Sequence, residues 1–247
     1  PLLLQVLQHA GGFAALRDLP DDEVVFARIS DTGHVALPAG RLRPVLETLA
    51  DLLDGSAAGD LRLPRARAVL LAELEERFGG SGLRWQGGKA LRELGRRLKD
   101  LRGLPPVQAP GGLRGTLRAY QQEGLNWLQF LREQEFGGIL ADDMGLGKTV
   151  QALALLLTEQ EAGRLDRPSL IVAPTSVLGT WREQAARFAP SLRVLLLHGP
   201  QRKEDFAAVP AHDVVLTSYA LLRHDEALHL AQPYHVAILD EAQFVKN

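Results

Sequence analysis

From residue 117 onward, short apolar runs alternate with stretches of helical periodicity, and few folds accommodate such an alternation. A helical stretch at 120–132 comes first, and five apolar runs follow, at 139–141, 169–173, 193–197, 214–217 and 236–239. Continuous apolar runs separated by helices are typical of parallel strands buried on both faces, with right-handed crossovers. The sequence therefore predicts an α/β fold whose parallel sheet is covered by helices on both faces and binds ligands at the carboxyl ends of its strands.

A glycine-bearing loop joins the first apolar run to a helix, in the stretch Phe136-Gly-Gly-Ile-Leu-Ala-Asp-Asp-Met-Gly-Leu-Gly-Lys-Thr149. Gly145 and Gly147 allow positive φ, so that backbone N–H groups can point at phosphate oxygens beside a helix N-terminus. Lys148 would then reach the β- and γ-phosphates, and the Thr149 hydroxyl would bind Mg²⁺. Asp142 breaks the first position of the pattern G-x-x-x-x-G-K-[ST]. Alone, the stretch therefore fits either a phosphate-binding P-loop or an ordinary loop that opens an amphipathic helix.

Composition narrows the class of protein. The length of 247 residues falls between one and two domains, and no apolar run approaches the roughly 18 residues of a membrane span. The first residues lack a signal peptide, so we expect a cytoplasmic protein without a membrane partner. Cysteine is absent, which excludes disulfides and thiolate metal sites. A net charge of -2 gives no general signature of binding to nucleic acid, which must then rely on local patches.

The first hundred residues follow a different pattern. Two β-prone runs, at 24–30 and 34–37, flank a turn at 31–33 and predict a β-ribbon. Helical periodicity follows at 39–53, 64–78 and 88–101.

The last of these helices carries much of the basic charge. Between Arg84 and Arg102 the sequence has seven basic residues and only two acidic ones. This excess of basic residues fits a solvated helix face or, as the alternative, a phosphate contact. A stretch rich in Pro and Gly at 103–112 follows and reads as a linker. We therefore expect a small, mostly helical α+β accessory domain at 1–105, a linker at 106–116 and a second domain at 117–247.

A second motif follows the glycine loop at His235-Val-Ala-Ile-Leu-Asp-Glu-Ala-Gln243, where an apolar strand ends in two carboxylates. This is typical of a Walker B strand: Asp240 would hold Mg²⁺, and Glu241 would orient and deprotonate the water that attacks the γ-phosphate. A surface turn would explain an isolated acidic pair equally well. After a P-loop in the same α/β array, the Walker B interpretation is the better one.

Five segments together carry a family resemblance. In chain order they are Leu117-Arg-Ala-Tyr-Gln-Gln-Glu-Gly-Leu-Asn-Trp127, the stretch DDMGLGKT, Leu170-Ile-Val-Ala-Pro-Thr-Ser-Val-Leu178, Leu216-Thr-Ser-Tyr219 and Asp240-Glu-Ala-Gln-Phe-Val-Lys-Asn247. These segments resemble the motifs of SWI/SNF-type ATPases of helicase superfamily 2, of the bacterial type, and the resemblance covers about residues 113–247. The family commonly carries an acidic residue at the position of Asp142, whereas Asp143 stands where Glu is more usual.

The resemblance implies a RecA-like sheet that uses ATP and Mg²⁺. It makes Lys148, Asp240 and Glu241 catalytic, and Thr149 and Asp240 the metal-binding residues. Gln121 would read the adenine edge with its amide, in a pocket shaped by Leu117, Arg118 and Tyr120. The nucleotide-binding residues it implies are Arg118, Tyr120, Gln121, Asp142, Asp143, Met144, Gly145, Leu146, Gly147, Lys148 and Thr149.

The resemblance also implies contacts with a nucleic-acid backbone. Thr175 and Ser176 would offer hydroxyl and N–H donors to phosphate, and Thr217 and Ser218 belong to a second motif of this kind. Capping of the following helices is the alternative for both pairs, and for Ser218 the two interpretations stay open. We expect Trp127 and Trp181 to be packing residues rather than platforms for base stacking.

The function implied by the resemblance is an ATP-dependent double-stranded DNA translocase of the chromatin-remodeller type, monomeric, located at the bacterial nucleoid and acting on a protein–DNA complex. An RNA helicase of the same superfamily and a non-catalytic binding module are the alternatives. Residues 1–105 resemble the accessory region of bacterial members more weakly, through 59–65.

The resemblance further implies that the chain is part of a longer protein. We expect the arginine donors for hydrolysis to come from a second lobe, so that this chain alone hydrolyses ATP negligibly. A further strand would lie between the runs at 139–141 and 236–239. The sheet would then be incomplete at its C-terminus, and those two runs would lie about twice the 4.8 Å strand spacing apart.

Overall fold

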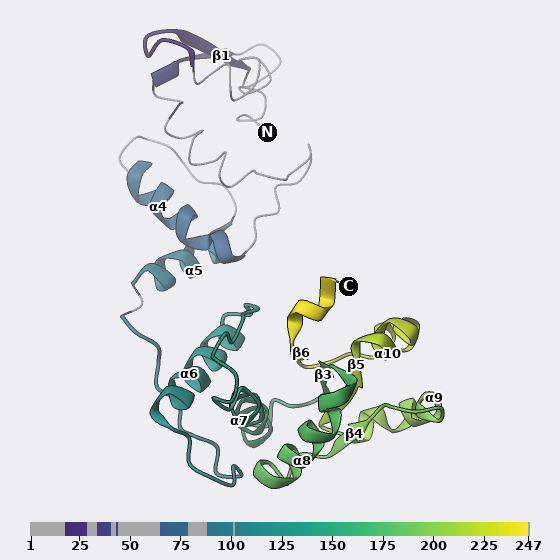
Figure 1. Cartoon of the computed structure of the whole chain (residues 1–247). Helices are drawn as coiled ribbons and strands as arrows, with labels where there is room; N and C mark the ends of the chain where they lie inside the picture. Colours follow the sequence, from purple (N-terminus) through teal and green to yellow (C-terminus); the bar gives the residue numbers. More distant parts are fainter. Residues whose placement is uncertain are drawn as a thin grey trace. The chain divides into compact units, whose positions relative to one another are not determined.

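Figure 1 presents the protein as a computed structural model, which describes residues 18–28, 34–40, 43, 65–78, 88–100 and 102–246. The chain divides into two compact units, Pro1–Gly103 and Leu104–Asn247, called here the N-terminal and the C-terminal unit. The predicted turn at 31–33 and most of the predicted helix at 39–53 lie outside the described residues. None of the described helices has the length and hydropathy that a membrane-spanning segment needs.

The N-terminal unit contains the predicted β-ribbon. Strands β1 (Val24–Arg28) and β2 (His34–Pro38) pair antiparallel, with Val24 opposite Pro38 and Arg28 opposite His34. Val25 is buried, whereas its neighbour Phe26 is exposed, as the alternation of side chains along a strand requires.

Two helices of this unit pack at close range. Helix α4 (Ala68–Phe78) follows the short 3₁₀ turn η1 (Arg65–Arg67), and helix α5 (Lys89–Lys99) lies against it. A Cβ atom at Gly95 would lie only 2.0 Å from the carbonyl oxygen of Ala68, so the absence of a side chain there allows the two backbones to approach. The helices predicted at 64–78 and 88–101 are confirmed.

The basic face of α5 is paired with acidic residues of α4. The Nε atoms of Arg92 and Arg96 each lie 3.2 Å from a carboxylate oxygen of Glu75, and Lys99 binds Glu76. These three cations are therefore held by carboxylates of the neighbouring helix, an arrangement that neither sequence-based interpretation included.

The C-terminal unit is built on a four-stranded, entirely parallel sheet of order β4-β5-β3-β6. Its strands are β3 (Ser169–Ala173), β4 (Val194–Leu196), β5 (Val214–Ser218) and β6 (Ala237–Leu239). Four of the five predicted apolar runs are therefore confirmed as strands, and so is the parallel arrangement.

Helices cover both faces of this sheet, as predicted. The helices described in this unit are α6 (Ala119–Glu133), α7 (Lys148–Glu161), η2 (Thr175–Val177), α8 (Leu178–Phe188), α9 (Arg202–Asp205), η3 (Phe206–Ala211), α10 (Tyr219–His224), α11 (Glu226–Leu230) and η4 (Ala242–Lys246).

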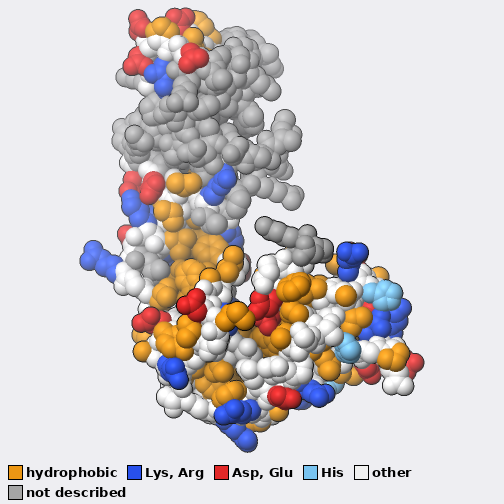
Figure 2. Space-filling view, in the orientation of Figure 1, with side chains coloured by type: hydrophobic (Ala, Val, Ile, Leu, Met, Phe, Trp, Pro, Cys, Tyr) orange, Lys and Arg blue, Asp and Glu red, His pale blue; other side chains and the backbone are white. Residues whose placement is uncertain are grey.

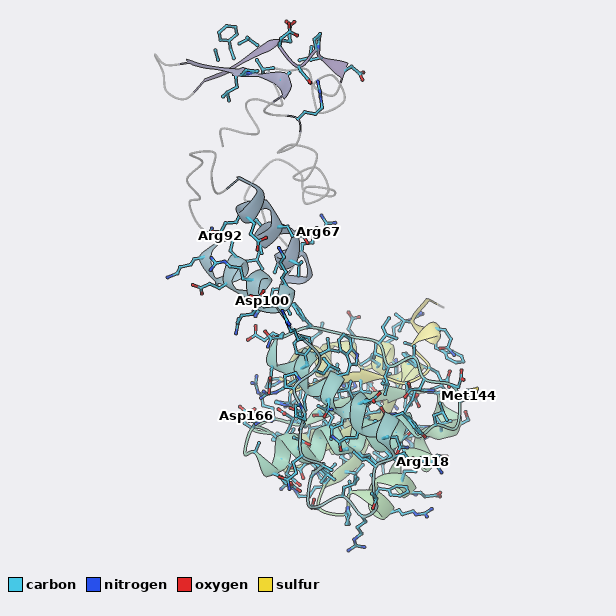
Figure 3. The ribbon with its side chains drawn as sticks, turned by 90° about the vertical axis from the view of Figure 1, so that its left-hand side faces the viewer. Arg67, Arg92, Asp100, Arg118, Met144 and Asp166 are labelled. Carbon is cyan, nitrogen blue, oxygen red and sulfur yellow. The ribbon has the colours of Figure 1, made fainter. Side chains whose placement is uncertain are left out.

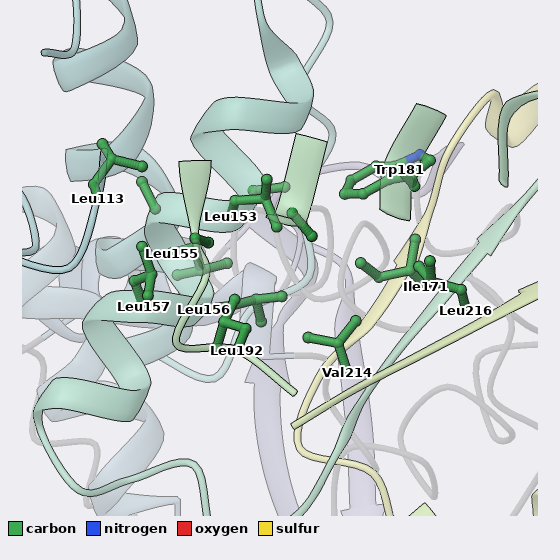
Figure 4. Close-up of a cluster of buried hydrophobic side chains, with 14 of the residues drawn as sticks. Leu113, Leu153, Leu155, Leu156, Leu157, Ile171, Trp181, Leu192, Val214 and Leu216 are labelled. Carbon is green, nitrogen blue, oxygen red and sulfur yellow. The ribbon is translucent and has the colours of Figure 1, made fainter. Parts of the chain in front are cut away.

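Alternate residues of the strands enter two separate cores. Ile171 of β3 and Leu216 of β5 pack with α7 and α8 in the larger core (Figure 4). Leu170 and Val172 face the other way and pack with Val209 of η3 in the smaller core. The alternation explains why these strands read as continuous apolar runs, because both of their faces are buried.

Ion pairs with buried carboxylates lie at the amino end of the sheet. Glu159 of α7 has a fully buried side chain and lies 2.7 Å from Arg132 Nε, 3.2 Å from Arg164 Nε and 3.1 Å from Nε2 of His235, just ahead of β6. Gln129 donates a further hydrogen bond of 3.2 Å. Burial raises the pKa of Glu159, but the hydrogen bonds from Arg164 and Gln129 and the charge of Arg132 outweigh that effect and leave the pKa lowered.

A second pair stands at the starts of β4 and β5. Asp213 accepts hydrogen bonds from the Arg193 guanidinium at 2.8 and 3.0 Å and from its backbone N–H at 2.8 Å. Burial raises the pKa of Asp213, and these bonds with Arg193 more than offset the rise, so that the pKa is lowered. The two pairs tie the sheet together where its strands begin.

The prediction of a buried strand at 139–141 is wrong. These residues form no strand, and the Ile139 side chain is 85% exposed. An extended segment becomes a strand only beside a partner that accepts and donates its backbone hydrogen bonds, and β6 pairs with β3 alone among the described strands. This agrees with the expectation that the segment does not pair directly with β6. The expected distance between the two stays a prediction.

Candidate nucleotide-binding site

The glycine loop ends at the N-terminus of α7, as the sequence predicts. Gly145 and Gly147 have φ values of 84° and 82°, which L side chains rarely adopt. Gly147 is the N-cap of α7, and a Cβ atom there would lie 2.6 Å from Nε2 of Gln121. The positive φ therefore favours glycine at this position, and any side chain there would also displace the Gln121 amide.

Lys148 lies against the backbone of its own loop. Its Nζ donates to the carbonyl oxygens of Asp142 at 2.6 Å and of Asp143 at 3.1 Å, and the Asp142 carboxylate accepts a hydrogen bond of 2.8 Å from buried Gln151. The ammonium is thus placed beside the loop that the sequence assigns to phosphate. The Met144 side chain is 87% exposed, at the periphery of the unit (Figure 3).

The segment assigned to adenine binding touches this loop directly. Tyr120 Oη and Gln121 Nε2 both donate to the carbonyl oxygen of Leu146 at 3.0 Å. The Gln121 Oε1 accepts a hydrogen bond of 2.9 Å from the backbone N–H of Arg118 at the start of α6. One glutamine therefore connects the helix start with the loop, a contact that the sequence did not predict.

A cavity of about 260 Å³ opens beside this segment. Arg118 and Gln121 are the predicted residues among those that line it, whereas Leu117 packs against the core. Sequence reasoning missed its walls from α7 and α8, because residues so distant in the chain carry no shared motif. The lining consists of Leu113, Arg114, Gly115, Thr116, Arg118, Gln121, Val150 and Phe188.

The acidic pair follows β6 at the carboxyl end of the sheet. The backbone N–H of Asp240 donates to Val172 of β3 at 2.8 Å, and its carbonyl oxygen accepts a hydrogen bond of 2.7 Å from Tyr219 Oη. Its carboxylate accepts from Trp181 Nε1 at 2.8 Å and from the backbone N–H of Glu241 at 3.1 Å. Burial and the negative charges of Asp240 and Glu241 raise the pKa of Tyr219, which keeps its hydroxyl protonated as a donor.

Glu241 adopts a left-handed backbone conformation, with φ of 51°, which is uncommon for a residue with a side chain. Its carboxylate accepts a hydrogen bond from Gln243 Nε2. The side chain is half-buried, and in the described structure it makes no ion pair.

The oxygen donors of Thr149 and Asp240 suit a hard cation. Mg²⁺ is usually bound by only one or two carboxylates together with waters and substrate phosphates, so it needs no preformed cage. Among the described residues, no group of three or more His, Asp or Glu side chains forms such a cage. Each carboxylate oxygen of Asp240 accepts one hydrogen bond and keeps capacity for a cation. The residues therefore fit Mg²⁺ together with a nucleotide.

The residues assigned to nucleic-acid contact follow the carboxyl ends of β3 and β5. Thr175 and Ser176 are exposed in η2. Thr217 and Ser218 are buried: the Thr217 hydroxyl donates to Leu197 O at 3.3 Å, and the Ser218 hydroxyl accepts from Leu221 N at 3.4 Å and caps α10. The capping alternative is thus observed for Ser218. The contact of all four residues with nucleic acid stays a prediction.

The visible face of the C-terminal unit carries Lys and Arg side chains interspersed with Asp and Glu, with apolar side chains between them (Figure 2). No single sign of charge dominates this face. The observation agrees with the absence of a general electrostatic signature in the composition.

The parallel sheet, the glycine loop at the start of α7 and the acidic pair after β6 define an α/β unit of the P-loop class. The family profile described as SNF2-related domain matches residues 120–247, more than half of the chain, and the chain belongs to this family. The predicted resemblance is thereby confirmed.

Several known proteins are similar to this chain. YwqA of Bacillus subtilis is 48% identical over 170 residues, which are 68% of this chain and 18% of that protein. Helicase SWR1 of Eremothecium gossypii is 45% identical over 146 residues, 57% of this chain and 10% of that protein. The SWI2/SNF2 ATPase core of Sulfolobus solfataricus, solved in complex with double-stranded DNA, superposes with a TM-score of 0.52 at 36% identity, covering 58% of this chain and 29% of that one. The chain thus spans less than a fifth of the length of these two curated relatives.

Proposed function

We propose that this chain supplies the nucleotide-binding lobe of an ATP-dependent double-stranded DNA translocase, monomeric and acting on a protein–DNA complex. The observation that carries the proposal is the P-loop and the acidic pair of an SNF2-type sheet within one unit. The similar ATPase core solved with double-stranded DNA supports the choice of DNA over RNA. Residues 1–105 would form an accessory domain, and 106–116 its linker.

In this proposal the loop between Asp142 and Gly147 receives the ATP phosphates with its backbone N–H groups. Lys148 exchanges the carbonyl partners that it has in the loop for phosphate oxygens, which are better partners for an ammonium. Gln121 keeps one amide hydrogen on Leu146 and has a second available for the adenine edge. The cavity beside Gln121 gives the base an apolar wall from Val150 and Phe188.

Thr149 and Asp240 would hold Mg²⁺, which neutralises charge that develops on the phosphates during transfer. Glu241 deprotonates the attacking water, for which its half-buried carboxylate is free of cationic partners among the described residues. Thr175 and Ser176 bind the DNA backbone from their exposed positions after β3.

The experiment that tests the proposal measures ATP turnover by the full-length protein with and without duplex DNA, because we expect arginine donors from a second lobe. Replacing Lys148 by alanine should lower DNA-stimulated turnover at least about a hundredfold, because removal of one charge-stabilising donor typically costs that much. The matched control is Lys203→Ala, the same change at an exposed position of α9. Near-normal turnover by Lys148→Ala contradicts the site assignment, and stimulation by RNA but not by duplex DNA favours an RNA helicase. Lack of turnover by the unaltered protein favours a non-catalytic binding module.

A further inference from the structure

Trp181 of α8 was expected to pack in the core, and it does. Its side chain is only 4% exposed and lies in the larger core with Ile171 and Leu216 (Figure 4). The indole N–H is the single polar group of this side chain, and it donates to Asp240 Oδ2 at 2.8 Å. A side chain that only packs in the core would not need this N–H group. The presence of tryptophan at this position therefore points to a second role for the side chain.

The bond fixes one specific oxygen of the carboxylate. Oδ1 of Asp240 accepts from the backbone N–H of Glu241, and Oδ2 accepts from Trp181. The two donors come from different elements, η4's leading turn and α8, so together they define the rotation of the carboxylate about its bond to Cβ. Trp181 is a firm anchor, because a buried ring in a close-packed core has little freedom to move.

We propose that Trp181 is a positioning residue for the metal site: its indole N–H holds the Asp240 carboxylate in the orientation that binds Mg²⁺ with the nucleotide. The proposal rests on the proposed function, because it gives Asp240 the metal role. Partners that orient a metal ligand through a hydrogen bond commonly change metal affinity 10- to 100-fold when they are removed. Tyr219 supports the same residue from another side, through its carbonyl oxygen, and does not touch the carboxylate.

The first test is the Mg²⁺ dependence of DNA-stimulated ATP turnover by full-length Trp181→Phe, which keeps an aromatic ring and loses the N–H. We expect the Mg²⁺ concentration at half-maximal rate to rise about tenfold, with the rate recovered at high Mg²⁺. An unchanged midpoint, whether or not the maximal rate falls, overturns the proposal, since a packing defect alone does not create a Mg²⁺ requirement. The matched control, Trp127→Phe on α6, removes a partly exposed indole and should leave the midpoint unchanged.

The second test keeps Trp181 in place and does not depend on turnover. The full-length protein is labelled with 5-fluorotryptophan, and the ¹⁹F signal of residue 181 is identified by its loss in Trp181→Phe. Mg²⁺ added with a non-hydrolysable ATP analogue should shift that signal, and Asp240→Asn should abolish the shift. A signal that stays unmoved while calorimetry shows the analogue binding overturns the proposal.

Failure of this inference differs from failure of the proposed function. If Lys148→Ala abolishes turnover while Trp181→Phe leaves the Mg²⁺ midpoint unchanged, the site assignment stands and the role of Trp181 is wrong. If Lys148→Ala turns over normally, the proposed function itself fails, and the positioning role fails with it.

Discussion

The two ends of the same sheet treat their carboxylates in opposite ways. At the amino end, Glu159 and Asp213 are bound by arginine side chains, and the pKa of each is lowered. At the carboxyl end, Asp240 accepts only from neutral donors, the indole of Trp181 and a backbone N–H, and in the described structure it has no ion pair. Glu159 and Asp213 therefore have their charge balanced within the protein, whereas the carboxylate of Asp240 can still bind a cation.

The two ends of the sheet differ mainly in whether the donors to the carboxylates are charged, and less in how deeply the carboxylates are buried. Glu159 is fully buried and would be expensive as an isolated charge, so its arginine, glutamine and histidine partners are needed for the fold. Asp240 is half-buried and oriented but not neutralised. We therefore expect substitutions at the amino end to change stability and substitutions at the carboxyl end to change turnover.

The largest effect is expected from Glu241→Gln at the carboxyl end. Loss of the base should lower DNA-stimulated ATP turnover of the full-length protein by about 10²- to 10⁴-fold, because that is the usual contribution of a general base. The unfolding temperature should hardly change, since the described partner of the side chain is Gln243 at the surface. Steady-state kinetics measure the turnover, and thermal unfolding measures the stability. A large fall in unfolding temperature would contradict the expected difference between the two ends of the sheet.

At the amino end, Glu159→Ala should destabilise the 247-residue chain by roughly 3 kcal/mol. Breaking a buried ion pair from one side costs about that much, because Arg132 and Arg164 lose their shared partner, although both keep some contact with water. Urea unfolding followed by tryptophan fluorescence measures the change. Glu183→Ala, at an exposed position of α8, is the matched control and should cost less than about 0.5 kcal/mol.

The same pairs predict how stability depends on pH. Because the folded-state pKa values of Glu159 and Asp213 are lowered, the unfolded chain binds more protons in the acidic range, and the free energy of unfolding rises with pH there. The contribution is present above about pH 4.5 and is lost as the pH falls through the folded-state values. Unfolding at a series of pH values should show a shallower acid slope in Glu159→Gln than in the unaltered chain. Identical slopes would mean that the ion pairs at the amino end of the sheet do not cause the pH dependence of stability.

A smaller loss of stability than that of Glu159→Ala is expected from Arg193→Ala. The Arg193 side chain is 63% exposed, so its pair with Asp213 is screened by water, and the backbone N–H of residue 193 still donates to that carboxylate. Urea unfolding is again the measurement. A loss as large as that of Glu159→Ala would mean that exposure does not weaken the pair.

A still smaller loss of stability, about 0.5 kcal/mol, is expected from Ser218→Ala, because it removes a long capping bond from the short helix α10. If capping is its whole role, duplex-DNA affinity of the full-length protein stays unchanged. Thr175→Ala, at an exposed position, should instead weaken DNA binding severalfold with little loss of stability. Equilibrium binding titrations compare the two variants, and a larger DNA effect from Ser218→Ala would reverse their assigned roles.

The sequence predicted those features that depend on local chemistry. The apolar run of β3 agrees with the structure at both ends, because burial on both faces leaves an uninterrupted signal. The glycines of the loop were equally readable, since positive φ at 145 and 147 is a local requirement.

Features made by distant residues could not be predicted. Trp181 and Asp240 are 59 positions apart, and nothing in either segment announces their hydrogen bond. The buried role of Glu159 depends on partners from α6, from the loop after α7 and from the segment just ahead of β6. The run at 139–141 failed for the same reason, since a strand depends on a neighbour that its own residues cannot specify.

The outer edge of β6 has a practical consequence for handling this chain. Its backbone N–H and C=O groups on that side have no strand partner in the described structure, and Leu239 beside them is 44% exposed. An open apolar edge is a template for edge-to-edge pairing between molecules. The 247-residue chain should therefore self-associate through β6 in concentrated solution. Replacing Ala237 or Leu239 by lysine should prevent this self-association.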